Sequence, residues 1–150
     1  MKIAIGNDHA ALELKNHLMD YLSKQGHEIV NFGTDSSEST DYPIYAARVA
    51  KAVVSGECER GILICGTGIG ISISANKIKG VRCALCSEPC SAKATRSHND
   101  ANILAMGART VGTLVAEGIV DAFLTTPFDG GRHQRRIDMI AELEEKQTLE

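Results

Sequence analysis

The sequence lacks the features of a membrane-bound or secreted protein. No apolar run approaches the roughly 20 residues of a membrane-spanning helix. The opening segment Met1–Gly6 is too short in apolar residues for a signal peptide and runs directly into the polar residues Asn7, Asp8 and His9. Five cysteines without a secretory signal predict reduced thiols and a cytoplasmic location. We therefore expect no membrane partner.

The sequence also has little positive charge. Its 16 Lys and Arg residues are outnumbered by 19 Asp and Glu residues, which gives a formal net charge of −3, and the basic residues are mostly dispersed. A nucleic-acid surface needs a basic patch, so we expect no nucleic-acid partner. The 43% hydrophobic and 23% charged content is that of an ordinary globular protein. A length of 150 residues suits one domain with a substantial core.

Strand-like and helix-like segments alternate along the whole chain, without an internal repeat. Short apolar and β-branched runs predict buried strands over 2–6, 28–32, 60–65, 81–86 and 102–106. Helices are predicted over 10–25 and 43–55, from 71, from about 87, from 107–109 to about 124, and from 128–136. This alternation predicts one α/β domain, residues 1–150: a three-layer α/β/α Rossmann-like sandwich around a five-stranded parallel sheet.

Helical spacing also predicts which side chains of the first two helices face the core. They are Leu12, Leu14, Leu18, Met19 and Leu22 in the first helix, and Ala46, Val49, Ala50 and Val53 in the second. The polar segment Gly33–Asp41, before the second helix, is long for an α/β connection. We predict that it forms a rim or a lid.

The stretch Gly61–Lys77 carries the strongest functional signal. It reads as a buried strand, then a loop with glycine at 66, 68 and 70, then a helix. This arrangement aims free backbone N–H groups and a helix N-terminus at an anion. Cys65 is the last residue of the strand and faces the helix N-terminus, which favours the thiolate. We therefore expect this thiol to act as a nucleophile or a base. The alternative is a tight turn with a buried structural cysteine.

The glycine loop matches none of the familiar phosphate motifs. A Walker A loop needs four residues between its glycines and then Lys followed by Ser or Thr, and a dinucleotide fingerprint needs G-x-G-x-x-G after the first strand. A cysteine phosphatase needs an arginine that closes the phosphate cradle, whereas Ile71 and Ser72 follow Gly70 here. We interpret the loop as an oxyanion-binding loop for a small ligand.

Further polar candidates lie at other predicted junctions. Asp8 and His9 follow the first strand, at the edge where α/β proteins bind ligands, although Asp8 also suits a helix cap. His98 lies in a polar connection before the fifth strand, where a histidine is usually just solvated. Arg132 and Arg136 are four residues apart and can clamp a phosphate. The alternative is that both arginines are ordinary solvent-exposed charges. That alternative is weakened because cations near the start of a helix oppose the helix dipole.

Three other cysteines invite a metal interpretation that the spacing does not favour. Cys83 and Cys86 are three residues apart on a predicted strand and therefore point to opposite faces of the sheet. No fourth ligand is spaced to join them and Cys90. We predict buried structural thiols and no metal.

Taken together, these motifs resemble one known family. They are, in order, Asn7-Asp8-His9, Asp41-Tyr42-Pro43, Ile64-Cys65-Gly66-Thr67-Gly68-Ile69-Gly70-Ile71, Ala75-Asn76-Lys77, His98-Asn99-Asp100-Ala101-Asn102 and Gly130-Gly131-Arg132-His133. The chain resembles, over essentially its whole length, the family of ribose-5-phosphate isomerase B and the galactose-6-phosphate isomerase subunits. The combination of C-G-T-G-x-G with S-H-N-D-A-N is highly specific.

The resemblance implies a metal-independent aldose–ketose isomerase without a cofactor that interconverts ribose 5-phosphate and ribulose 5-phosphate. It implies that Cys65 moves the proton between C2 and C1, and that His98 assists opening of the furanose ring. The residues implied to bind substrate are Asp8, His9, Gly66, Thr67, Gly68, Ile69, Gly70, Asn99, Arg109, Arg132 and Arg136. Among them Thr67 and the loop amides hold the enediolate oxygen, and the two last arginines bind the phosphate.

The resemblance also implies a homodimer, or a tetramer, whose site is shared across the interface, with His98, Asn99 and Arg109 supplied by the neighbouring subunit. Some family members use a glutamate a few residues after the loop instead of the cysteine, whereas this chain has Cys65 and Ser74. The alternatives are an isomerase of a hexose 6-phosphate, such as allose 6-phosphate or galactose 6-phosphate, and a non-catalytic sugar-phosphate sensor.

Overall fold

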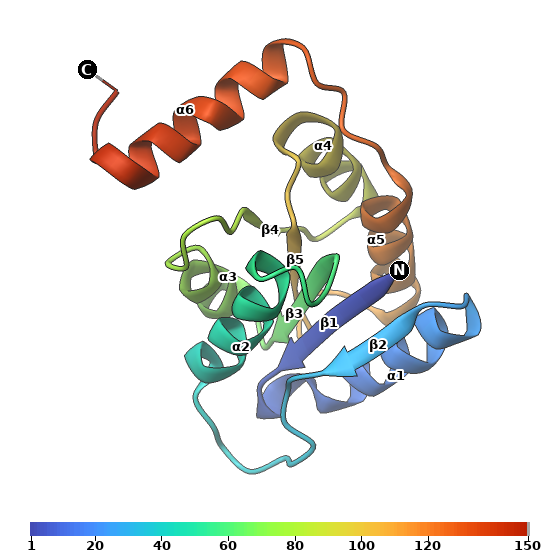
Figure 1. The fold of residues 1–150 in the computed structure, drawn as a ribbon. Helices are drawn as coiled ribbons and strands as arrows, with labels where there is room; N and C mark the ends of the chain where they lie inside the picture. Colours follow the sequence, from blue (N-terminus) through green and yellow to red (C-terminus); the bar gives the residue numbers. More distant parts are fainter. Residues whose placement is uncertain (150) are drawn as a thin grey trace.

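The fold is a three-layer sandwich around a parallel sheet. The computed structural model describes residues 1–149 (Figure 1). Its strands are β1 (Lys2–Asn7), β2 (Glu28–Asn31), β3 (Arg60–Cys65), β4 (Cys83–Leu85) and β5 (Ile103–Gly107). They form one five-stranded, all-parallel sheet in the order β2-β1-β3-β5-β4. The predicted α/β architecture is confirmed.

The helices connect the strands in turn. A short 3-10 turn, η1 (His9–Ala11), precedes α1 (Leu12–Lys24), and the others are α2 (Tyr42–Val54), α3 (Ile69–Ala75), α4 (Pro89–Asn99), α5 (Thr113–Thr125) and α6 (Arg132–Lys146). No helix within residues 1–149 is both long enough and apolar enough to cross a membrane.

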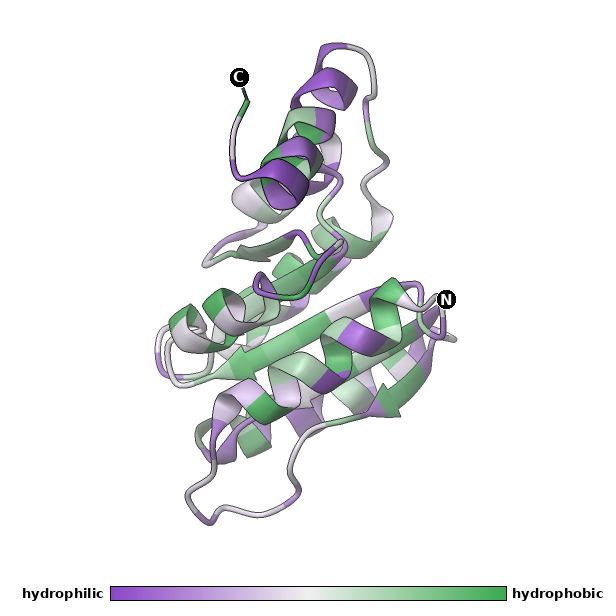
Figure 2. Cartoon of the chain, turned by 60° about the vertical axis from the view of Figure 1, so that its left-hand side comes forward, coloured by the Kyte–Doolittle hydropathy of each residue, from purple (hydrophilic) through white to green (hydrophobic). Residues whose placement is uncertain are grey.

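The sheet is apolar on both faces because helices cover both. In the central strand, Ile62 and Ile64 belong to one buried cluster, and Leu63 and Cys65 belong to the other. Side chains of α1 and α5 fill the first cluster, and side chains of α2 and α3 fill the second. Figure 2 shows the strands as a hydrophobic layer between helices that carry polar residues outward. Near-continuous apolar strands are typical of such doubly covered parallel sheets.

The predicted core faces of the first two helices are largely confirmed. All four predicted side chains of α2 are buried, and so are Leu14, Leu18 and Leu22 in α1. Met19 packs against the cluster from its edge. Leu12 lies at the margin and is half-buried. Lys15, in the middle of the same helix, is fully buried, which the hydrophobic pattern did not predict.

Some predicted boundaries are wrong. His98 and Asn99 were predicted in a loop, but they form the last turn of α4, which ends at Asp100 with a left-handed backbone (φ 44°). The helix predicted from Ile71 begins at Ile69, and β4 is only three residues long. The last two differences follow from short elements, in which local periodicity is too brief to fix an end.

The last helix lies outside the sandwich. α6 follows an extended segment and passes over α4, away from the sheet (Figure 1). Glu144 accepts a hydrogen bond from the Gly80 N–H at 2.9 Å, and Glu145 forms an ion pair with Lys79. Met139, Ile140 and Leu143 remain between 41% and 44% exposed on this helix. α6 is therefore held to the body by these polar contacts and by the buried side chain of Ile137.

We expect Leu18→Ala to lower the free energy of unfolding by about 2–5 kcal/mol, because Leu18 is fully buried between α1 and the sheet and its truncation leaves a cavity. Urea denaturation measures the change. The matched control is Leu114→Ala, since Leu114 is 80% exposed and its truncation should shift stability by less than about 0.5 kcal/mol. Equal losses in both variants would contradict this assignment of the core.

Candidate active site

Three strands bring their ends together at one edge of the sheet. Cys65 ends β3 and pairs with Gly107, which ends β5. The Asp8 N–H donates to the Ile64 carbonyl at 3.2 Å, and the Ala108 N–H donates to the Cys65 carbonyl at 2.8 Å. These backbone bonds join the segments that follow β1, β3 and β5. Asp8 and Cys65 therefore both lie at the carboxyl ends of neighbouring parallel strands.

The glycine loop wraps around the thiol of Cys65. The Gly68 N–H donates to the Cys65 Sγ at 3.1 Å, and Cys65 is only 4% exposed. The Ile69 N–H donates to the Thr67 hydroxyl oxygen at 3.3 Å, and Thr67 itself is exposed. The loop therefore places one backbone donor at the Cys65 sulfur and further amide donors at the start of α3.

Gly68 is required by the geometry of this turn. Its φ is +77°, a left-handed conformation that other residues seldom adopt. A Cβ at this position would lie 2.4 Å from the Leu85 Cδ1 and 2.8 Å from the Met106 backbone carbon. The loop can fold back onto β5 only because residue 68 has no side chain.

Arg109 lies beside the loop of its own chain. A Cβ placed on Gly66 would be 3.4 Å from the Arg109 Nη1, and the Arg109 N–H donates to the Gly66 carbonyl at 2.9 Å. The expectation that the neighbouring subunit supplies Arg109 to this loop is therefore wrong. A flexible, exposed guanidinium here adds a positive charge next to Cys65, within the same chain.

His9 is held in one tautomer by the polar loop predicted to form a rim. Its Nδ1 accepts a hydrogen bond from the Thr40 N–H at 3.2 Å, so the hydrogen of the neutral ring is on Nε2. Asp8 caps η1 by accepting from the Ala10 N–H at 3.0 Å, as the helix-cap alternative proposed. His9 also lines a cleft of about 600 Å³ that reaches Ala108. Its Nε2–H is therefore available to an acceptor.

Lys15 anchors that loop, and sequence reasoning missed it. Its ammonium, with a fully buried side chain, donates to the Thr34 carbonyl at 2.9 Å and forms an ion pair with the Asp35 carboxylate. The hydrogen bond from Lys15 lowers the pKa of Asp35. A lysine is almost never buried without such partners. The only indication in the sequence that Lys15 is buried is its position among the leucines of α1.

A second group of predicted residues gathers elsewhere, at the end of α4. The rings of His98 and His133 stack with centroids 4.5 Å apart and planes 12° apart. The Asp129 N–H donates to the Ser97 carbonyl at 3.0 Å, which fixes the segment before α6 against α4. Burial and the nearby His98, together with the arginines on either side, lower the pKa of His133. The two predicted phosphate ligands, Arg132 and Arg136, are on this side, on α6.

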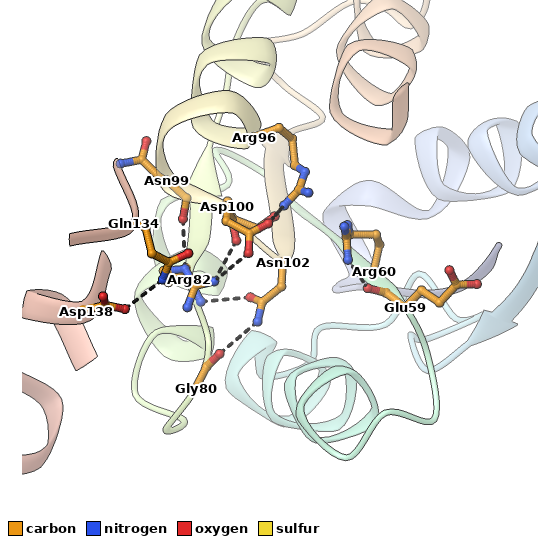
Figure 3. A network of polar contacts seen from close by, with 11 residues as sticks. Glu59, Arg60, Gly80, Arg82, Arg96, Asn99, Asp100, Asn102, Gln134 and Asp138 are labelled. Atoms are coloured by element: carbon orange, nitrogen blue, oxygen red, sulfur yellow. Dashed lines mark hydrogen bonds and ion pairs between the residues drawn. The ribbon is translucent and has the colours of Figure 1, made fainter. Parts of the chain in front are cut away.

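A partly buried ionic network positions His98 and Asn99. Asp100 accepts a hydrogen bond from Arg96 at 2.7 Å and one from Arg82 at 3.3 Å, while Arg82 also donates to the Asn99 carbonyl at 2.9 Å. Figure 3 shows these contacts converging on Asp100, with the Asn99 amide pointing away from them. Asn102 continues the network by donating to the Gly80 carbonyl at 2.9 Å. Within the His98–Asn102 motif, Asp100 and Asn102 therefore stabilise the fold.

The two groups lie at opposite edges of the sheet within one chain. α4 ends at Asn99, just before β5 begins, whereas Cys65 pairs with Gly107 at the far end of β5. A strand rises about 3.3 Å per residue, so the length of β5 alone separates the groups by about 13 Å. The structure therefore brings together Asp8, His9, Cys65, the glycine loop and Arg109, and separately His98, Asn99, Arg132 and Arg136.

Cys83 and Cys86 pack into the interior as the sequence predicted, whereas Cys90, which was predicted to be buried as well, is exposed. Cys86 packs in the cluster under α1 and α5, and Cys83 packs against the cluster under α2 and α3, so the two thiols face opposite sides of the sheet. Burial raises the pKa of Cys83 to about 12 and that of Cys86 to about 11. These thiols stay protonated at neutral pH and are poor metal ligands.

Comparison with known proteins finds similarity along the whole chain. The model of the ribose/galactose isomerase family matches residues 3–140. A ribose-5-phosphate isomerase B from Escherichia coli is 52% identical over 147 residues, which cover 98% of this chain and 99% of that protein. A D-erythrulose-4-phosphate isomerase from Pectobacterium atrosepticum is 40% identical over 148 residues, covering 98% and 97%. The structure of ribose-5-phosphate isomerase B from Clostridium thermocellum superposes with a TM-score of 0.97 and 53% identity, covering 99% and 100%.

We expect Asp100→Ala to lower the free energy of unfolding by about 2–3 kcal/mol, because it leaves the buried guanidinium of Arg96 without its carboxylate. Thermal or urea unfolding measures the loss. Asp138→Ala is the control, since Asp138 is exposed and accepts a hydrogen bond from Gln134 on the same helix. A near-neutral Asp100→Ala would show that the network does not hold this segment.

Proposed function

This chain belongs to the ribose/galactose isomerase family and is an isomerase, and we propose that it interconverts ribose 5-phosphate and ribulose 5-phosphate. The observation that carries the proposal is the Cys65 thiol, held by the Gly68 N–H at the end of the central strand. The similarity to proteins named ribose-5-phosphate isomerase B covers nearly the full length of each chain.

Cys65 acts as the base in the proposed reaction. The thiolate removes the proton from C2 of the open-chain aldose and returns it to C1, through an enediolate. A proton next to a carbonyl can be removed only if the oxyanion that forms is stabilised, and preoriented N–H groups of the loop supply that stabilisation. Ser74 donates its hydroxyl to the Gly70 carbonyl at 2.8 Å, so no carboxylate competes for the role of base there. The site therefore fits the cysteine type of the family.

The remaining residues open the sugar ring and hold the phosphate. His98 exchanges a proton with the ring oxygen, because an imidazole can both donate and accept a proton. The guanidiniums of Arg132 and Arg136 bind the dianionic phosphate, with the Nε2–H of His9 near it, while Arg109 contacts the substrate beside the glycine loop. Because the phosphate is held remotely from Cys65, the distance between them measures the length of the carbon chain.

Other substrates of the same chemistry are the nearest alternatives. A relative named D-erythrulose-4-phosphate isomerase shares 40% of its residues with this chain, so the fold accommodates more than one sugar phosphate. A hexose 6-phosphate stays a second candidate on the same grounds. A non-catalytic sugar-phosphate sensor is a poorer candidate, because it would not need Cys65 and His98 together.

We expect wild-type protein to form ribulose 5-phosphate from ribose 5-phosphate in the presence of EDTA, and Cys65→Ala to lower kcat by about 100-fold or more, because general-base catalysis contributes that much. Circular dichroism checks that the variant folds. Cys65→Ser is the matched variant: it preserves size but replaces the thiol with a much weaker acid. Full turnover in Cys65→Ala would place the base elsewhere. No pentose turnover in wild type would direct the assay to tetrose and hexose phosphates.

We also propose a homodimer in which each active site takes residues from both chains. Cys65 and His98 lie at opposite edges of the sheet in one chain, so a site that uses both needs a neighbouring molecule. A two-fold dimer supplies two equivalent composite sites. Cys65, His9 and Arg109 come from one chain, and His98, Asn99, Arg132 and Arg136 from the other. The exposed apolar residues of α6 and α3 are consistent with contact between chains.

Mixing two inactive variants tests the shared site. Cys65→Ala and His98→Asn chains, unfolded together in equal amounts and refolded, should recover about a quarter of wild-type activity, since half of the dimers are mixed and each mixed dimer has one intact site. Each variant refolded alone is the control. If both residues served a site within one chain, every chain in the mixture would carry a defect and no activity would return.

We propose a cytoplasmic location for the enzyme. All five thiols are free, including the exposed Cys90 and the proposed base Cys65. A base that works as a thiolate needs a compartment that keeps cysteines reduced.

A further inference from the structure

Three potential metal ligands meet where α4 ends and α6 begins. One ligand atom each from His98, Asp129 and His133 lie within 4.8 Å of one another. His98 comes from the last turn of α4, Asp129 from the segment before α6, and His133 from the first turn of α6. His98 and Asp129 are exposed, whereas His133 is only 8% exposed. The cluster is therefore open to solvent on one side and supported on the other.

We propose that His98, Asp129 and His133 form a binding site for a divalent transition cation of the zinc type. Two imidazoles and one carboxylate are a ligand set that suits Zn²⁺, and Co²⁺ binds similar sets. Three protein ligands leave an open position for water or for a substrate oxygen. The buried thiols of Cys83 and Cys86 offer no competing site, because burial keeps them protonated.

The backbone holds these ligands near one another. The Asp129 N–H donates to the Ser97 carbonyl at 3.0 Å, next to His98, and the His133 N–H donates to the Gly130 carbonyl at 3.0 Å. Gly130 and Gly131 have φ values of 64° and 56°, which turn the chain sharply between the two ligand-bearing segments. The stacked rings must rotate for their nitrogen lone pairs to converge on one ion, and the exposed His98 ring is free to do so.

The surroundings set the strength of the site. Arg132 and Arg136 are on the same helix as His133 and repel a dication, whereas the Asp129 carboxylate attracts it. The open geometry and these cations make binding weaker than at a closed structural zinc site, and readily reversible. The metal is not needed for the isomerase reaction, in which the loop amides stabilise the oxyanion.

Occupation of the site blocks His98. A metal on its imidazole removes the proton-exchanging nitrogen from the ring-opening step, so the cation acts as an inhibitor. This consequence rests on the proposed function, whereas the binding itself does not.

Cobalt binding tests the site without any assay of activity. Metal-free, full-length protein titrated with Co²⁺ should develop visible absorption bands of nitrogen and oxygen ligation, saturating near one ion per chain, and Zn²⁺ should displace the Co²⁺. Asp129→Asn and His133→Asn should each weaken binding by about 10-fold or more. Cys65→Ala and Cys90→Ser are the controls and should bind as wild type does. Circular dichroism of each variant confirms its fold.

Several outcomes would overturn the proposal. The first is the absence of saturable Co²⁺ binding. The second is a sulfur-to-cobalt charge-transfer band that disappears with Cys65→Ala or Cys90→Ser, which would place the ion on a cysteine. The third is undiminished Co²⁺ binding by folded Asp129→Asn. In a separate arm, Zn²⁺ should inhibit wild-type turnover reversibly, with EDTA restoring it, and Asp129→Asn should need about 10-fold more Zn²⁺ for the same inhibition. Binding without inhibition would overturn the inhibitory role alone. A protein without isomerase activity would refute the proposed function and leave the binding result intact.

Discussion

A helix that joins two parallel strands must run back along the sheet, so its last residues lie at the edge opposite to the strand ends. This constraint governs the whole arrangement. It places Cys65, at the end of β3, with Asp8 and Arg109 at one edge, and it places His98, at the end of α4, at the other. A chain with this topology carries two distinct polar clusters, and the proposed chemistry needs both.

Each cluster depends on a buried charge that the catalytic proposal does not use. Lys15 fixes the polar loop, and through Thr40 that loop selects the tautomer of His9. Asp100 joins Arg82 and Arg96 and so fixes the end of α4. Buried ions with several partners hold one geometry, because any rearrangement leaves a charge without its partner.

Much of the architecture was predictable from local sequence. The strand Arg60–Cys65 was predicted with its observed bounds, because apolar residues run without interruption to a glycine loop. The place of His98 in a helix was not, since its polar neighbours look like a connection and only the contacts of Asp100 with Arg82 and Arg96 extend the helix. The assignment of Arg109 to the partner was wrong because a resemblance carries roles but not distances. Lys15 was missed because its partners are about 20 residues away in the sequence.

The tight turn at residue 68 has a consequence for how the gene can change. Every amino acid except glycine carries a Cβ, and here that atom would meet both Leu85 and the backbone at Met106. Only synonymous nucleotide changes at this codon leave the turn intact. Selection against all other changes is therefore imposed by the space next to β5, independently of which sugar phosphate the enzyme binds.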